Sequence, residues 1–175
     1  MEIKKIKVYS FEELSKEAKE KVLNDFRENN EYHFLEEYLK DFLKERLKEV
    51  KIKEVGETKL YYSLSYSQGD GCCFIGLFEW KNYNIKITHN FRYYHSKSVD
   101  FEITQDNLIN DVGVKEEADE EIYKEFKKLY ENVCYEVEKT GYNFIEAENS
   151  EETIKENIEA NEYLFYSNGE IYKEI

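Results

Sequence analysis

The spacing of the apolar residues changes near Thr58, and no other feature of the sequence constrains the fold as strongly. Before this point apolar side chains recur every three or four residues, as they do on one face of a helix. From this point Leu60, Tyr62 and Leu64 occupy alternate positions, as in a strand. The helical spacing returns in the last third. This order predicts an α+β fold.

Two helices are expected before the change. Ser10 and Glu13 have the spacing of a capping box, which predicts a helix that begins there and ends near Asn29. A second helix is expected from about Tyr32 to Val50, because its leucines and aromatic residues fall on one wide face.

Strands are expected over residues 3–9, 58–67, 72–80, 83–90 and about 98–104, with short polar connections between the last four. Short connections join antiparallel neighbours, since parallel strands need a long crossover. The sequence therefore predicts an antiparallel sheet of about four to six strands, packed against N-terminal and C-terminal helices.

The last third predicts a long helix over residues 116–139 and a short helix over 150–160. Asn168 and Gly169, between two aromatic segments, predict a closing hairpin. The chain contains no proline, and it has no linker-like, repeated or low-complexity segment. We therefore expect residues 1–175 to form one domain.

Composition favours a folded protein. The chain is 41% hydrophobic and contains 16 Tyr and 11 Phe, which is too rich for a disordered protein. Its first ten residues contain no apolar signal segment, and no stretch approaches the roughly 20 apolar residues of a membrane helix. We expect a cytoplasmic protein that is neither exported nor anchored in a membrane.

Three cysteines are an odd number, and their spacing matches neither a disulfide framework nor a zinc site. Cys72 and Cys73 are adjacent on an expected strand, so we expect one of them in the core and the other facing outward. No metal site and no cofactor is expected.

Acidic side chains are concentrated in one part of the chain. The net charge is −14, and residues 111–175 alone carry 19 acidic and 7 basic side chains. We therefore do not expect the chain to bind nucleic acid directly, because such binding depends on Lys and Arg. A basic protein is the complementary partner.

Two interpretations of these acids remain open: a solvated helix face, or a surface that imitates a nucleic-acid backbone and binds a basic groove. Under the second interpretation, the partner-binding residues are Glu116, Glu117, Glu120, Glu121, Glu125, Glu131 and Glu138.

A second candidate site combines a loop with two histidines. Ser67, Gln68 and Asp70 lie among glycines that would let a ligand approach the backbone, but the same residues suit a tight turn whose Asp binds its own backbone. His89 and His95 could act as bases, but no nucleophile or acid stands at a diagnostic spacing. These five residues define a small-ligand site or an enzyme site as an alternative function.

Four segments, residues 10–18, 66–71, 92–96 and 158–163, together resemble a family of small acidic proteins that bacteriophages and prophages encode. The similarity spans nearly the whole chain, and the Ser-Gln-Gly-Asp-Gly element at 67–71 is its most specific part. Family members commonly have Trp where this chain has Tyr66.

The resemblance implies a phage origin, and hence the cytoplasm of the host cell, and an accessory protein that is not an enzyme. By analogy with other small acidic phage proteins, the leading hypothesis is an anti-CRISPR or antirestriction inhibitor that binds a basic host effector. An assembly module that uses exposed tyrosines is a further alternative. The oligomeric state stays open.

Overall fold

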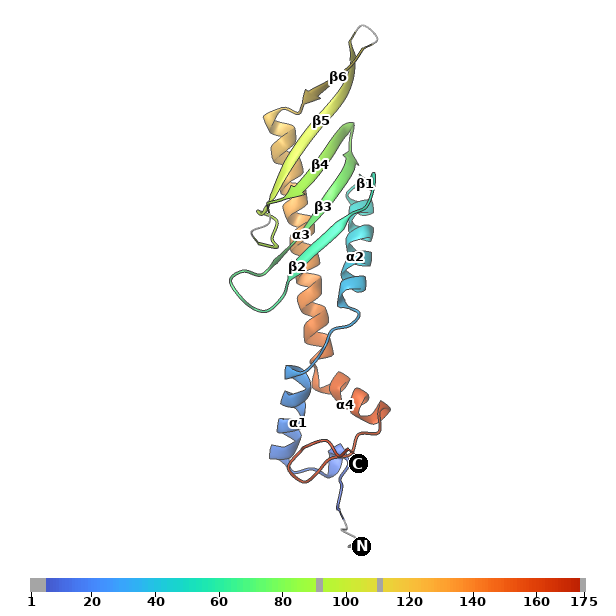
Figure 1. Cartoon of the computed structure of the whole chain (residues 1–175), viewed down its shortest axis with the longest axis vertical. Coiled ribbons are helices and arrows are strands. Elements are labelled where there is room, and N and C mark those ends of the chain that lie inside the picture. The colour runs from blue at the N-terminus through green and yellow to red at the C-terminus, as the bar shows by residue number, and fades with distance from the viewer. Residues whose placement is uncertain (1–5, 91–92, 110–111, 174–175) are drawn as a thin grey trace. The chain divides into compact units, whose positions relative to one another are not determined.

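The computed structural model describes residues 6–90, 93–109 and 112–173 (Figure 1). Within it the chain forms two compact units: unit 1 from residues 1–33 and 144–175, and unit 2 from residues 34–143. Helix α3 (Glu120–Glu148) contributes residues to both units.

Unit 2 is built on a six-stranded sheet in which every pair of neighbours is antiparallel. The strands are β1 (Ile52–Glu54), β2 (Lys59–Ser63), β3 (Gly71–Trp80), β4 (Tyr83–His89), β5 (Val99–Ile109) and β6 (Val112–Glu117). Their order is β1-β3-β4-β5-β6, with β2 also paired to β3. The predicted α+β class with an antiparallel sheet is confirmed.

Strands β1 and β2 act as one interrupted edge strand along β3. Ile52 stands opposite Trp80, and Ser63 stands opposite Gly71. Four residues of the edge strand, 55–58, lie opposite only two of β3, so the edge carries a bulge between the two pairings.

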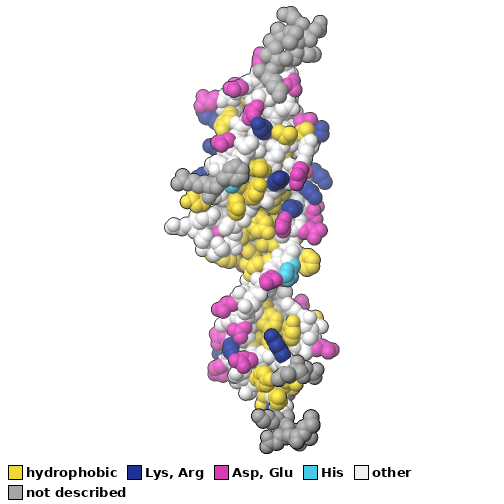
Figure 2. All heavy atoms as spheres, in the orientation of Figure 1, with side chains coloured by type: hydrophobic (Ala, Val, Ile, Leu, Met, Phe, Trp, Pro, Cys, Tyr) yellow, Lys and Arg dark blue, Asp and Glu magenta, His cyan; other side chains and the backbone are white. Residues whose placement is uncertain are grey.

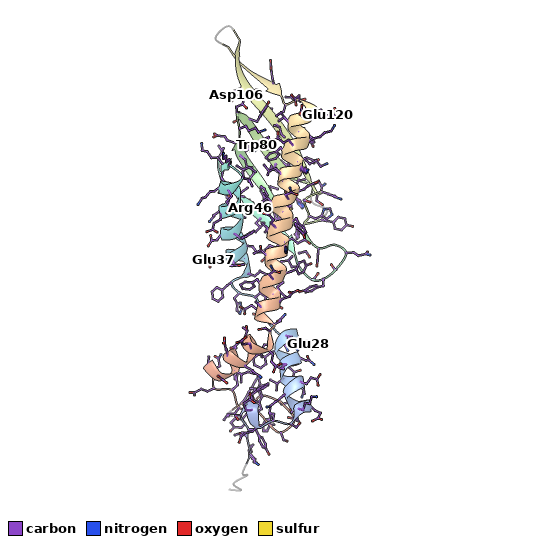
Figure 3. All side chains as sticks on the ribbon, turned by 180° about the vertical axis from the view of Figure 1, so that it is seen from behind. Glu28, Glu37, Arg46, Trp80, Asp106 and Glu120 are labelled. Atoms are coloured by element: carbon purple, nitrogen blue, oxygen red, sulfur yellow. The ribbon has the colours of Figure 1, made fainter. Side chains whose placement is uncertain are left out.

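Two helices cover one face of this sheet, and the other face is left without a helix (Figures 1 and 3). Helix α2 (Leu35–Glu49) buries Leu39, Leu43 and Leu47, which recur every four residues. The spacing that predicted the helix therefore also defines the side that packs.

Helix α3 packs on the same face through large aromatic side chains. The ring of Phe126 lies 5.4 Å from that of Trp80 and 5.6 Å from that of Phe101, centroid to centroid. Gly141 lies in the part of α3 that belongs to unit 2. A Cβ on this residue would lie 2.4 Å from Cδ1 of Leu64, so only glycine fits there without a shift of the leucine side chain.

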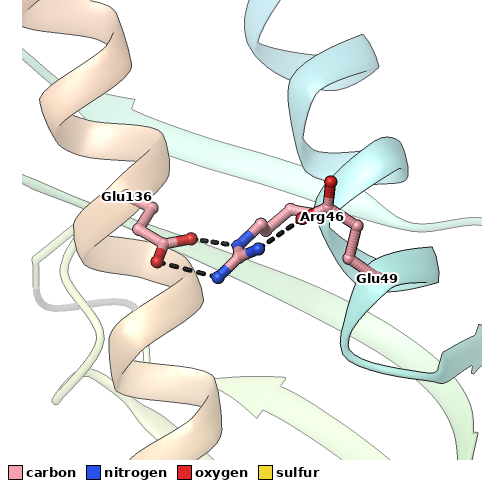
Figure 4. A network of polar contacts seen from close by, with 3 residues as sticks. All are labelled: Arg46, Glu49 and Glu136. Atoms are coloured by element: carbon pink, nitrogen blue, oxygen red, sulfur yellow. Dashed lines mark hydrogen bonds and ion pairs between the residues drawn. The ribbon is translucent and has the colours of Figure 1, made fainter.

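An arginine joins the two covering helices (Figure 4). Nη2 of Arg46 on α2 donates to Oε1 of Glu136 on α3 at 2.9 Å, and Nε donates to the other carboxylate oxygen. Arg46 also pairs with Glu49 on its own helix. The bidentate geometry specifies the register of α2 against α3.

A tyrosine hydroxyl completes the backbone hydrogen bonds of the sheet. Strand β4 is in register with β3 only from Gly76 to Trp80. Beyond it, the hydroxyl of Tyr130 on α3 accepts from the N–H of Phe74 at 3.0 Å and donates to the Phe74 carbonyl at 2.9 Å. The helix thus supplies both partners at a place where β4 does not pair with β3.

Unit 1 is helical. It contains the short 3-10 helix η1 (Phe11–Glu13), α1 (Lys16–Glu28), α4 (Glu151–Ala160) and the end of α3. Its core consists of Phe11, Leu14, Ala18, Val22, Leu23, Ile154, Ile158 and Phe165. The closing segment forms the isolated bridges Tyr9–Phe165 and Phe165–Ile171 instead of a full hairpin.

Further expectations also need correction. The helix expected from Ser10 is interrupted: η1 ends at Glu13, and α1 begins after its cap, Ser15. Of the strand expected over residues 3–9, residues 3–5 lie outside the described part, and Tyr9 forms only a bridge.

The helix expected from Glu116 begins at Glu120, because Glu116 and Glu117 pair with β5 as the end of β6. Cys72 and Cys73 are both buried. On the sheet face to which Cys73 points, its strand partner Tyr61 stacks on the rings of His89 and Tyr94.

Replacement of Tyr130 by Phe is expected to leave the N–H and the carbonyl of Phe74 without partners and to lower the free energy of unfolding by about 3 kcal/mol. Trp80 is the only tryptophan and belongs to unit 2, so its fluorescence in urea reports this unit. The control is Tyr135→Phe on the same helix, where a 63% exposed side chain predicts a change below about 0.5 kcal/mol. Equal losses in the two variants would contradict the bridging role.

Candidate functional site

Two loops meet at one end of the sheet in unit 2. The first, residues 64–70, joins β2 to β3, and the second, residues 90–98, joins β4 to β5 (Figure 1). They touch at Gly71, where a Cβ would lie 2.4 Å from Cβ of His95 and 3.0 Å from the carbonyl oxygen of Tyr94. The loop with the predicted residues Ser67, Gln68 and Asp70 is therefore in contact with the loop that carries His95.

Asp70 is the centre of the first loop. Its Oδ1 accepts from the hydroxyls of Ser63, Ser65 and Ser67 at 2.9, 2.8 and 3.0 Å. Its Oδ2 accepts from the N–H groups of Ser65 and Ser67 at 2.6 and 2.9 Å and from the hydroxyl of Tyr142 at 2.6 Å. A carboxylate offers about four lone-pair positions, so six donors leave no position for a ligand or a metal ion.

Near neutral pH Asp70 stays ionised and Tyr142 stays protonated. Burial raises the pKa of Asp70, but the hydrogen bonds from Tyr142 and the serines outweigh burial and hold that pKa well below its usual range. Burial and the bond to Asp70 raise the pKa of Tyr142 to about 12. Neither group exchanges a proton at the pH where acid-base catalysis operates. Asp70 therefore organises the loop.

The two histidines form hydrogen bonds with backbone atoms of the second loop. His89 is buried, its Nε2 lies 2.7 Å from the carbonyl oxygen of Tyr93, and its ring stacks on Tyr61 at 5.3 Å between centroids. Because a carbonyl only accepts, Nε2 carries the proton. Nδ1 of His95 accepts from the N–H of Lys97 at 3.2 Å. Both histidines therefore support the second loop.

Three tyrosines project from these loops, and sequence reasoning about individual residues did not select them. Tyr66 is 67% exposed, Tyr93 51% and Tyr94 44%; we call these three residues the loop tyrosines. Only the high tyrosine content signalled them in advance. In Figure 2, hydrophobic side chains gather on the sheet face that the helices leave uncovered.

Tyr66 is held in an unfavourable backbone conformation. Its φ is 56°, in the left-handed region, which costs a residue other than glycine about 1–2 kcal/mol. Its ring lies 4.8 Å from that of Tyr142, which also donates to Asp70. The hydrogen bonds of Asp70 therefore help to hold Tyr66 in its strained backbone conformation, in which its side chain is exposed to solvent.

Gln68 is exposed, and Ser67 binds the Asp70 carboxylate through both its N–H and its hydroxyl. No group of three or more His, Cys, Asp or Glu side chains within the described residues could hold a metal ion. The predicted ligand-site residues thus form a structured loop pair without a converging reactive set.

The seven predicted partner-binding acids do not form one face. Glu116 and Glu117 are exposed but adjacent on a strand, so their side chains point to opposite faces. Glu120, Glu121 and Glu125 are exposed on α3, and the first and last of these pair with Lys124 and Lys81. The remaining two acids, Glu131 and Glu138, are half-buried.

Glu138 belongs to the loop site instead of the acidic surface. Burial and the charge of Asp70 raise its pKa, while His95 lowers it. The helix position that looked like part of a solvated face therefore lies within electrostatic reach of both loops.

The cysteines are not a reactive site. Cys72, Cys73 and Cys134 are free and buried. Burial and the neighbouring Cys134 raise the pKa of Cys73 to about 12. A buried thiol with a raised pKa forms little thiolate at neutral pH, so it is a poor nucleophile.

No helix among the described residues has both the length and the apolar composition that crossing a bilayer requires. Comparison with protein-family models, with curated proteins and with solved structures finds no match to this chain. The resemblance to phage-encoded proteins stays a prediction.

Replacement of Asp70 by Asn is expected to lower the free energy of unfolding of unit 2 by about 3 kcal/mol at pH 7, because charge-assisted hydrogen bonds are lost. The pKa of Asp70 is lower in the folded state than in the unfolded state, where it is about 3.9. The stabilisation is therefore complete well above pH 4 and is lost as the pH falls below it.

Urea unfolding followed by Trp80 fluorescence at pH 7 and pH 3 measures both effects. The control is Asp41→Asn on α2, where an exposed pair with Lys44 predicts a change below about 0.5 kcal/mol. An Asp70→Asn variant as stable as the Asp41→Asn variant would show that the hydrogen-bond centre is unimportant.

Replacement of Gly71 by Ala is expected to displace the second loop, because the added Cβ would meet backbone and Cβ atoms of residues 94 and 95. We expect a loss of about 1–3 kcal/mol and shifted imidazole resonances of His95 in NMR spectra. Gly69→Ala is the matched control, since nothing lies within 4 Å of a Cβ there. Unshifted His95 resonances in the Gly71→Ala variant would argue against loop contact.

Proposed function

We propose that this chain is a binding protein without chemistry of its own, which inhibits a basic, nucleic-acid-handling protein by occupying it. The loop tyrosines carry the proposal: three exposed tyrosines stand on two loops that touch each other, one of them organised by the hydrogen bonds of Asp70. Tyrosine is enriched among the residues that dominate binding energy at interfaces. A rigid loop loses little conformational entropy on binding.

Charge supports the choice of partner. The net charge of −14 attracts a basic protein and repels nucleic acid. Exposed acids follow one another from the end of β6 into α3, at Glu116, Glu117, Asp119, Glu120 and Glu121. The resemblance to phage proteins makes a CRISPR or restriction effector of the bacterial host the expected partner.

The chemistry of the loops argues for binding over catalysis. Asp70 has every lone-pair position occupied, and both histidines are engaged with backbone groups. The alternative of a small-ligand or enzyme site therefore has no group in this loop pair that is poised to react.

The test begins with affinity capture by the tagged chain from a lysate of a bacterial host that carries defence systems, at low and high salt. The captured protein is then purified, and its stoichiometry, affinity and inhibition are measured with the purified chain. We expect a one-to-one complex with a basic partner, weakened by salt.

Tyr66→Ala with Tyr93→Ala is expected to weaken this complex at least about 30-fold. The matched control is Tyr38→Ala with Tyr135→Ala, two tyrosines of comparable exposure on α2 and α3. Equal affinities of the two double variants, or the absence of any captured partner above background, would overturn the proposal.

A further inference from the structure

Unit 1 contains a pocket of about 220 Å³. We infer that it binds one apolar side chain of a partner protein, from a flexible segment in which that side chain stands next to a lysine or arginine. The pocket is lined by Ser10, Phe11, Glu12, Lys155, Ile158, Glu159, Glu162, Tyr163 and Leu164. The inference does not rest on the proposed function, which concerns unit 2.

The size of the pocket favours a side chain over a whole metabolite. Pockets for drug-sized ligands measure roughly 300–1,000 Å³, so this one is smaller. Its floor is apolar, with Phe11 and Ile158 from the core and the rings and methyl groups of Tyr163 and Leu164 above them. Tyr163 and Leu164 are 36% and 40% exposed. An apolar side chain would cover this surface.

The rim determines the charge of the occupant. Lys155 already pairs with Glu151 at 2.8 Å, and Glu12 already pairs with Lys19 at 2.9 Å. No ion pair to Glu159 or Glu162 forms within the described part of the chain. Two exposed carboxylates beside an apolar floor complement a cation that adjoins an apolar group. The occupant is therefore a basic peptide segment.

The end of α4 builds this arrangement through its capping geometry. The N–H of Tyr163 donates to the carbonyl of Ile158, and the N–H of Glu162 donates to the carbonyl of Glu159, both at 3.1 Å. This is the Schellman pattern, in which the residue after the cap takes a left-handed conformation and the next residue packs back on the helix. Tyr163 occupies the position of that next residue, and it lines the pocket together with Ile158.

Glu162 occupies the left-handed position, with φ at 51°. Glycine or asparagine is usual there, because other residues pay a steric cost. Glu162 therefore places its carboxylate at the rim at a cost in stability. A residue with a purely structural role would not carry this cost, so we assign Glu162 a role in binding. Glu162→Asn should keep or raise stability while it weakens binding.

The test is an NMR titration of the isotopically labelled full chain with the blocked peptide Lys-Leu-Phe-Lys. We expect saturable shifts at the amides of residues 158–164. The peptides Glu-Leu-Phe-Glu and Lys-Ser-Ser-Lys should bind at least about tenfold more weakly, because one lacks the cations and the other the apolar side chains.

Glu159→Gln with Glu162→Asn, and separately Leu164→Ser, should each weaken binding about tenfold. The matched control is Glu152→Gln with Glu156→Gln, which changes the same number of charges on exposed positions of α4 that do not line the pocket. Equal weakening by this control would reduce the effect to general charge attraction and overturn the inference.

Two other outcomes would also overturn it. Shifts at residues 158–164 that depend on protein concentration without peptide would mean that a second copy of the chain fills the pocket. Equal binding of Lys-Leu-Phe-Lys and Glu-Leu-Phe-Glu would mean that the rim does not select charge. Failure of affinity capture in the preceding test leaves this titration unaffected, so the two proposals fail separately.

Discussion

The hydroxyl of Tyr130 is the interaction on which the architecture of unit 2 depends. By accepting from the N–H and donating to the carbonyl of Phe74, it satisfies backbone groups that have no partner in β4. β3 can therefore continue past its pairing with β4, next to β2 alone, without leaving the backbone groups of Phe74 unsatisfied. This end of β3 also carries Gly71, where the second loop packs against the first.

The first loop, residues 64–70, is ordered by hydrogen bonds that also occupy its carboxylate. Asp70 collects donors from the turn and from Tyr142, which lies 72 positions later in the chain. The same six bonds that fix the loop occupy the carboxylate, so order and chemical inertness have one cause. What the loop offers to another molecule is the exposed aromatic surface around it.

A feature of this fold could be predicted from the sequence only where a local pattern of residues records it. The helices and most strands were predictable, because apolar periodicity records which side is buried. β6 was missed, because its acidic end continues smoothly into the acidic start of α3, and only pairing with β5 distinguishes them. The binding of Asp70 to its own turn was foreseen as one interpretation, whereas Ser63 and Tyr142 are tertiary donors that no local motif records.

Charge and aromatic surface act at different ranges, which makes the scattered acids compatible with specific binding. Charges spread over β6 and α3 attract a basic partner over about a Debye length and raise the association rate without a defined geometry. Residence time depends on close, desolvated contacts, which in the proposed complex come from the loop tyrosines. Seven acids on one face are therefore not required. In the proposed complex the two tasks belong to different segments: the exposed acids lie on a strand end and a helix start, and the tyrosines lie on the loop pair.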